Sequence, residues 1–450
     1  MKDLRPLLII LCFLLSTSYA LGQLCDQDKR FTTIAYFSDT QIDSLKNITY
    51  GNAIDYLGKS QDLKMDIYFP NNDIDTIKKR PFILLIHGGG FYGGARDNFI
   101  YHSNEFAKRG FVVATMSYRL GFNQNDSGDL QKAVYRAQQD AHTALRYINS
   151  QAEKLNIDKS WIFIGGSSAG AITSLFASYA SQAEWNQVLP SFEETLGSLK
   201  SSETNMDDSL KIKGIYNFMG AVQPIVFASG DLIPTISFHG ELDKTVPIGK
   251  SQFTGFGSKP IHDMLTKAGV CSNLTIVKGG YHDIYLSAEG LNFRINRVAN
   301  FFKSLMCDSC TSTVYTDEAI KNNKDINYEV LSAIKEGNIQ KLDELIDINE
   351  LDKCHGIQGG LYNFLAFSIK LESFESLKYF INKKANLEGN CTGKTPLMYA
   401  AKYGQLDALK YLLKNGADIN YTYDGKSALD YAKNYNHSDI QKYLEDYKSD

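Results

Sequence analysis

The chain has 450 residues, of which 43% are hydrophobic and 22% are charged, and its formal net charge is −4. This is the composition of an ordinary globular protein, and the length favours more than one domain. The small net charge argues against a nucleic-acid partner, because such partners select strongly basic surfaces.

The first 22 residues have the pattern of a signal peptide. Two basic residues precede an apolar stretch from Leu7 to Leu15, and small and polar residues follow. This stretch is too short to span a bilayer comfortably, and no later stretch is long and apolar enough to do so. The sequence therefore predicts cleavage after Ala20 or Gly22, and a secreted or periplasmic protein without a stable membrane span.

Strand-like and helix-like segments alternate from Leu63 to about Lys303. Strands are expected at residues 64–70, 81–86, 111–118, 161–164, 211–221, 232–240 and 272–280. Helices are expected at residues 104–109, 129–151, 169–180, 261–270 and 291–305. This alternation predicts an α/β fold with a mainly parallel central sheet.

A polar stretch at about residues 181–211 interrupts the alternation. It has no strand pattern, and a stretch of this length inside an α/β domain is usually functional or an added subdomain. We expect a small cap over the active site, and a disordered surface insertion is the alternative.

A nucleophile elbow is predicted at Ser168. The apolar run Trp161–Ile164 has the pattern of a strand, the segment Gly166–Gly170 follows Gly-x-Ser-x-Gly, and a helix pattern comes next. A pattern centred on Ser167 would need a glycine where Ala169 stands. A strand, a sharp turn and a helix lift the central serine above the sheet, where it can act as a nucleophile.

A run of three glycines after the strand at 81–86 is the candidate oxyanion hole. Glycine lets the backbone come close and turn its N–H groups toward a substrate oxygen. We expect the N–H groups of Gly89, Gly90 and Ala169 to form this hole. His87, which precedes the glycines, is expected to be structural.

A serine hydroxyl needs a base, and the base needs an orienting carboxylate. The segment "HGELDKTVP" supplies Asp243 after a strand, with Glu241 as the second choice. His282 follows the last predicted strand of the domain, and it is the histidine that comes after the acid at a strand end. His262 lies in a helix pattern and is expected at the surface. The order serine, acid, histidine is that of the α/β-hydrolases.

Residues from about 50 to 305 resemble the α/β-hydrolase esterase/lipase family, of the carboxylesterase or hormone-sensitive-lipase-like kind. The motifs "HGGGF", "GGSSAG", "HGELDKTVP" and "GGYH" occur in the order found in that family. The resemblance implies a hydrolase domain over residues 23–310 that cleaves a small-molecule, carbohydrate or lipid ester through an acyl-enzyme on Ser168. It implies no metal or cofactor. The elbow departs from the common form, with Ser167 before the nucleophile and Ala-Gly-Ala after it, which leaves the subfamily open.

Two other functions remain open at this stage. One is a secreted serine peptidase of the same fold, although no propeller or large cap is visible in the sequence. The other is a non-enzymatic binding or scaffold protein of hydrolase-like fold, although such relatives usually lose a triad residue and none is missing here.

The composition changes after Cys310. Residues 311–327 are polar and are expected to be a linker, and residues 328–450 contain a repeat with a period near 33. Leu377 and Leu409 occupy equivalent positions, 409 − 377 = 32 residues apart. The segments "GKTPL" and "NGADIN" make the repeats resemble ankyrin repeats, which implies an all-α module that could bind a protein partner.

Six of the seven cysteines follow the signal peptide, and an even number in an exported chain favours disulfides. Cys354 and Cys391 lie in successive connections between repeats, so we expect them to pair. The other four would pair within the hydrolase domain in an undetermined connectivity: Cys25, Cys271, Cys307 and Cys310. No second cysteine or histidine pair has the spacing that a zinc site with Cys307-x-x-Cys310 would need.

Overall fold

The computed structural model describes residue 25 and residues 29–123, 126, 128–199, 211–227, 231–252, 254–282, 284–285, 288–318, 328–357, 360–391, 393–423, 425–435 and 437–447. The expected signal peptide lies outside these residues and stays a prediction. The chain divides into two compact units, residues 1–284 with 292–319, and residues 285–291 with 320–450.

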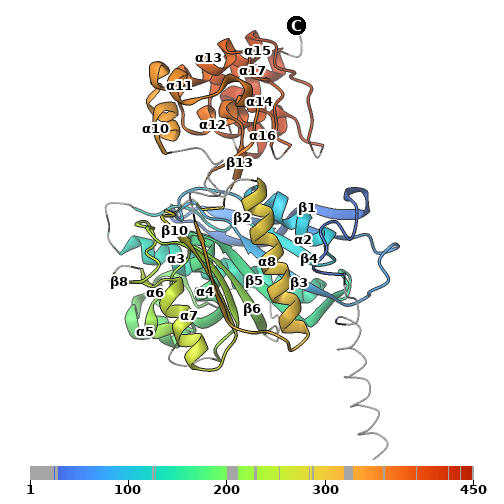
Figure 1. The fold of residues 1–450 in the computed structure, drawn as a ribbon, viewed down its shortest axis with the longest axis vertical. Helices are drawn as coiled ribbons and strands as arrows, with labels where there is room; N and C mark the ends of the chain where they lie inside the picture. The colour runs from blue at the N-terminus through green and yellow to red at the C-terminus, as the bar shows by residue number, and fades with distance from the viewer. Residues whose placement is uncertain are drawn as a thin grey trace, which may run out of the picture. The chain divides into compact units, whose positions relative to one another are not determined.

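A nine-stranded sheet forms the centre of the first unit (Figure 1), in the order β1-β2-β4-β3-β5-β6-β7-β10-β11. The pairs from β4 to β11 are parallel, while β1 and β2 are antiparallel to their neighbours. This arrangement confirms the predicted fold class. The strands are β1 (Ile42–Ile54), β2 (Ser60–Pro70), β3 (Arg80–Ile86), β4 (Val112–Met116), β5 (Ile157–Ser167), β6 (Ile212–Phe218), β7 (Thr235–Gly240), β10 (Ser272–Lys278) and β11 (Thr313–Glu318), with a separate hairpin of β8 (Lys250–Ser251) and β9 (Gly255–Phe256).

Helices cover both faces of the sheet. Ile162 and Ile164 of β5 belong to one core cluster with residues of five helices, whereas Phe163 stacks on Phe302 of α8 with ring centroids 4.0 Å apart. Neighbouring residues of a strand point to opposite faces, so α8 covers the other side. This explains why β3 and the second half of β5 are continuous apolar runs. The principal helices of this unit are α2 (Ile100–Lys108), α3 (Asp129–Gln151), α4 (Ala169–Tyr179), α7 (Ser258–Lys267) and α8 (Ala288–Met306), of which residues 292–306 belong to this unit.

The edge strands β1 and β11 were not predicted. The expected linker at 311–327 is wrong in its first part, because Thr313–Glu318 pairs in parallel with β10. Both strands lie at the edge of the sheet, and Tyr50 is the one fully buried residue of β1. An edge strand that buries little carries a weak hydrophobic pattern, which is why periodicity missed it.

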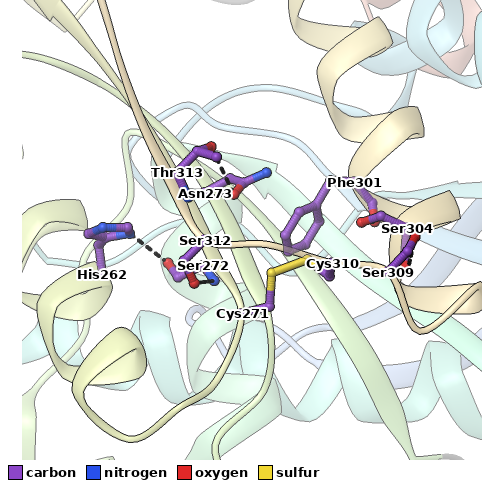
Figure 2. Close-up of a disulfide and its surroundings, with 10 residues drawn as sticks. All are labelled: His262, Cys271, Ser272, Asn273, Phe301, Ser304, Ser309, Cys310, Ser312 and Thr313. Carbon is purple, nitrogen blue, oxygen red and sulfur yellow. Dashed lines mark hydrogen bonds between the residues drawn. A yellow bond between two sulfur atoms is a disulfide. The ribbon is translucent and has the colours of Figure 1, made fainter.

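A disulfide between Cys271 and Cys310 fastens β11 to β10 (Figure 2). Beside it, the Ser272 N–H donates to Ser312 Oγ at 3.0 Å, and the Thr313 N–H donates to Asn273 Oδ1 at 3.0 Å. These bonds set the register in which β11 joins the sheet.

Cys307 pairs with Cys25, so the two cysteines of the Cys-x-x-Cys segment have different partners. The segment is therefore structural in this state and is not a dithiol pair. His262, which we expected at the surface, is buried, and its Nδ1 lies 3.0 Å from Ser272 Oγ (Figure 2). The expectation failed because the side of α7 that carries His262 packs against β10.

The described part of the expected cap forms α5 (Gln182–Val188) and α6 (Ser191–Leu196). Trp185 and Phe192 are buried against Tyr135 of α3, with ring centroids 5.2 and 5.7 Å from it. Trp185 also stacks on Phe176 of α4. This part of the insertion is thus joined to the core. Residues 200–210 lie outside the described part of the chain, and a cap over the site stays a prediction.

The second unit contains paired helices that follow the predicted repeats. They are α10 (Tyr328–Glu336) with α11 (Ile339–Leu345), α12 (Phe364–Lys370) with α13 (Phe374–Asn382), α14 (Pro396–Lys402) with α15 (Leu406–Lys414), and α16 (Ala428–Asn434) with α17 (Ser438–Tyr447). A hairpin of β12 (His355–Ile357) and β13 (Gly360–Tyr362) lies between the first two pairs. Cys354 and Cys391 form a disulfide across two successive connections.

Candidate active site

Ser168 sits in a strained turn between β5 and α4. Its backbone has φ 53° and ψ −119°, a region that residues other than glycine rarely adopt. A Cβ at Gly166 or Gly170 would lie only 2.3 or 2.0 Å from the Ile86 carbonyl oxygen, so the turn is pressed against the end of β3. The Ser168 N–H donates to the Phe218 carbonyl at 2.8 Å, which ties the turn to β6 as well. Strain of this kind persists where the surroundings hold it, and it is common at functional sites.

The structure brings Ser168, His282 and Asp243 into one hydrogen-bonded chain. Ser168 Oγ lies 2.8 Å from His282 Nε2, and His282 Nδ1 lies 2.6 Å from Asp243 Oδ2. The three residues follow β5, β10 and β7, whose carboxyl ends share one edge of the parallel sheet. The sheet topology therefore gathers residues that are up to 114 positions apart in the chain.

The Asp243 carboxylate is buried, and both of its oxygens accept hydrogen bonds. Its side chain is 0% exposed, and Oδ1 accepts the N–H groups of Thr245 and Val246, both at 2.9 Å. Burial alone would raise the pKa of Asp243, but hydrogen bonds from His239 and His282 outweigh it and hold the pKa well below its usual range. Asp243 is therefore an anion that faces His282 in a fixed orientation.

His239 is a neighbour of the site that our sequence reasoning did not single out. Its Nε2 lies 2.7 Å from the Val246 carbonyl oxygen and 3.2 Å from Asp243 Oδ2. A carbonyl only accepts, so Nε2 carries the proton and is shared between the two oxygens. Its Nδ1 lies 2.7 Å from Ser258 Oγ. The signal was present in the sequence, since His239 begins the segment that contains Asp243.

The second-choice acid, Glu241, points elsewhere. Its carboxylate pairs with Lys278 at 2.5 Å and accepts the Gly279 N–H at 3.2 Å. Both side chains of this ion pair are more than a third exposed. Asp243, not Glu241, is the carboxylate that contacts His282.

The glycine loop after β3 packs directly on the elbow. A Cβ at Gly88 would lie 2.8 Å from the Ser167 carbonyl oxygen, and Gly89 and Gly90 have φ values of +115° and +63°. The Ala169 N–H is the first of α4, and the first N–H groups of a helix lack an intrahelical acceptor. Two glycine amides and a helix N-terminus thus belong to segments that meet beside Ser168.

His87 supports this loop. Its ring is buried and stacks on Tyr118 with centroids 4.4 Å apart, and its Nδ1 lies 2.7 Å from the Gly88 carbonyl oxygen. A Cβ at Gly94 would lie 2.5 Å from His87 Nδ1, so the loop closes tightly over the ring.

Comparison with known proteins agrees with this architecture. Residues 65–223 match the family model described as BD-FAE, and residues 330–423 match the model for ankyrin repeats (3 copies). The chain combines an esterase/lipase-type α/β-hydrolase domain with ankyrin repeats.

The alignments with similar curated proteins span small parts of the chain. Methylphloroacetophenone synthase of Cladonia uncialis is 47% identical over 60 residues, which is 13% of this chain and 2% of that protein. Gut esterase 1 of Caenorhabditis elegans is 34% identical over 99 residues, or 21% of this chain and 17% of that protein. The matches to curated relatives span only 2% to 28% of the length of those proteins.

Among solved structures, esterase 2 of Thermogutta terrifontis is similar with 21% identity and a TM-score of 0.45. That match covers 60% of this chain and 96% of the esterase.

Two features are absent from the described residues. No group of three or more His, Cys, Asp or Glu side chains in them could hold a metal ion. No helix in the same residues is both long and apolar enough to cross a bilayer.

Proposed function

We propose that this protein is a serine hydrolase that cleaves carboxylic esters through an acyl-enzyme on Ser168. The observation that carries the proposal is the hydrogen-bonded chain Ser168–His282–Asp243, with distances of 2.8 and 2.6 Å. Distances in this range allow a base to take the serine proton as the bond to the substrate forms.

In the first half-reaction, Ser168 Oγ attacks the ester carbonyl carbon and its proton passes to His282 Nε2. Asp243 holds the Nδ1 proton of His282 and stabilises the imidazolium that forms. The carbonyl oxygen becomes an oxyanion, which we assign to the N–H groups of Gly89, Gly90 and Ala169. The imidazolium then donates its proton to the alkoxide leaving group, and the acyl-enzyme remains.

In the second half-reaction, a water molecule gives a proton to His282 and attacks the acyl carbon. The resulting tetrahedral oxyanion occupies the same position as before. Collapse of this intermediate returns the proton from His282 to Ser168 Oγ and releases the carboxylic acid. None of these steps requires a metal or a cofactor.

The substrate and the cellular context are part of the proposal. We infer a small-molecule, carbohydrate or lipid ester as the substrate, and a protein partner for the ankyrin repeats. We also infer a secreted or periplasmic location, which the signal-like first 22 residues and three disulfides support, since disulfides persist in oxidising compartments.

The test combines covalent labelling with a substrate series. A fluorophosphonate probe should modify Ser168, as mapped by peptide mass spectrometry, and p-nitrophenyl esters of increasing acyl length should be hydrolysed. Ser168→Ala should abolish both, whereas Ser167→Ala, which removes only the neighbouring hydroxyl, should retain most of the activity. Labelling at Ser167 would refute the assignment of the nucleophile. A protein that cleaves peptides but no ester would be a peptidase, and one that does neither would be a binding protein.

A further inference from the structure

A buried cation lies on the α8 side of the sheet, outside the proposed catalytic chain. Arg294 of α8 is 1% exposed, and its guanidinium carbon lies 3.6 Å from the centroid of the Phe218 ring. The carbonyl of Phe218 accepts the Ser168 N–H, so this cation sits against the residue that anchors the elbow. An arginine is always charged in proteins, and an isolated charge is costly to bury.

No described carboxylate forms an ion pair with Arg294. The one side chain that the described structure places within hydrogen-bond distance is His102, whose Nε2 lies 2.7 Å from Arg294 Nη2. Burial lowers the pKa of Arg294, and Tyr216 is the ionisable group that opposes this effect. A neutral phenol and a neutral imidazole do not neutralise a guanidinium.

Within the described residues, several polar atoms around Arg294 have no hydrogen-bond partner, and each of them can act as a donor. Arg294 Nε and Nη1 are buried and have no acceptor. His102 Nε2 must accept from Arg294, so the neutral ring carries its proton on Nδ1, and this N–H also has no partner. The Tyr216 hydroxyl is likewise buried without a partner. The buried guanidinium and the donors around it would therefore all be satisfied by a negatively charged acceptor.

We propose that Arg294, with Tyr216 and His102, forms a buried site for a small monovalent inorganic anion such as chloride. The anion accepts hydrogen bonds from the guanidinium and the phenol and neutralises the charge next to Phe218. Because the site lies between α8, α2 and β6, its occupant stabilises the folded state without taking part in the ester chemistry. Binding to the folded chain alone raises stability with anion concentration.

The test measures unfolding of the full chain against chloride at constant ionic strength, with gluconate as the bulky balancing anion. The unfolding temperature should start to rise as chloride approaches its dissociation constant and should then increase with the logarithm of the chloride concentration, and bromide should substitute for chloride. Tyr216→Phe removes one donor but keeps the cation, so the dissociation constant for chloride, obtained from this dependence, should rise about tenfold. Arg294→Met should abolish the dependence.

The matched control is Arg297→Met, one turn further along α8, where the guanidinium lies near the rings of Phe293 and Tyr315. This variant should keep the chloride dependence. Crystals grown in bromide should show an anomalous peak beside Arg294, a readout that stands even if Arg294→Met does not fold. Equal unfolding temperatures in chloride and gluconate, or only water beside Arg294 in the bromide crystals, would overturn the proposal.

Discussion

The disulfide between Cys354 and Cys391 should hold the second unit together, and its contribution can be worked out from the loop it closes. The two cysteines are 37 positions apart. In the chain-entropy model, closing a loop of this length in the unfolded chain removes a fixed term of about 2.1 cal/mol/K plus 1.5R ln n, which gives about 4 kcal/mol at 25 °C. Replacing both cysteines with serine should therefore lower the free energy of unfolding of this unit by about that amount.

The first unit offers a matched control. Cys271 and Cys310 are 39 positions apart, so the same model predicts a nearly equal loss, but in the hydrolase domain. The two units can be followed separately, because both tryptophans of the chain, Trp161 and Trp185, belong to the first one.

The assay pairs urea unfolding by tryptophan fluorescence with hydrogen exchange of the amides in α12 and α13, which lie inside the Cys354–Cys391 loop. Cys354→Ser/Cys391→Ser should lower the protection of these amides about 10³-fold and leave the fluorescence midpoint unchanged. Cys271→Ser/Cys310→Ser should lower the fluorescence midpoint and leave the protection of the amides in α12 and α13 unchanged. Protection that stays within tenfold of the wild type would refute the reasoning and would mean that packing alone holds the repeats.

Three further outcomes are expected. Asp243→Asn should cut turnover roughly 10⁴-fold, because His282 loses the anion that orients it, while Glu241→Gln should change turnover little; steady-state kinetics decide, and the reverse order would show that the acid is misassigned. Gly170→Ala should lower both the unfolding temperature and activity, since its Cβ would meet backbone at 2.0 Å, whereas Gly249→Ala, with open space around it, should change neither. Burial lowers the pKa of His355 to about 4, so the unfolded chain binds the extra proton between pH 4 and 6.5. The second unit should therefore lose about 3 kcal/mol as the pH falls through that window, and His355→Leu should flatten this slope in urea titrations followed by circular dichroism.

Local patterns in the sequence were sufficient for the fold class, the repeats and the candidate residues. An uninterrupted apolar run such as that of β3 marks a strand covered on both faces. The two glycines around Ser168 mark a turn in which a Cβ would collide with β3. The candidates Ser168, Asp243 and His282 could be named in advance because each lies directly after a strand, and parallel strands end at one edge of the sheet.

Only the tertiary structure decided the features that depend on contacts between distant segments. The connectivity of Cys25, Cys271, Cys307 and Cys310 follows from where the end of α8 and the start of β10 meet, which no spacing reveals. Edge strand β11 has a partner on one side only and buries little, so its pattern resembled that of a linker. The burial of His262, and the charge of Arg294 without an ion-pair partner among the described residues, depend on which groups the packed helices bring near, and these groups are 10 and 192 positions away in the chain. A side chain's environment is set by such neighbours rather than by its own segment, and this is the part of the protein that sequence patterns do not encode.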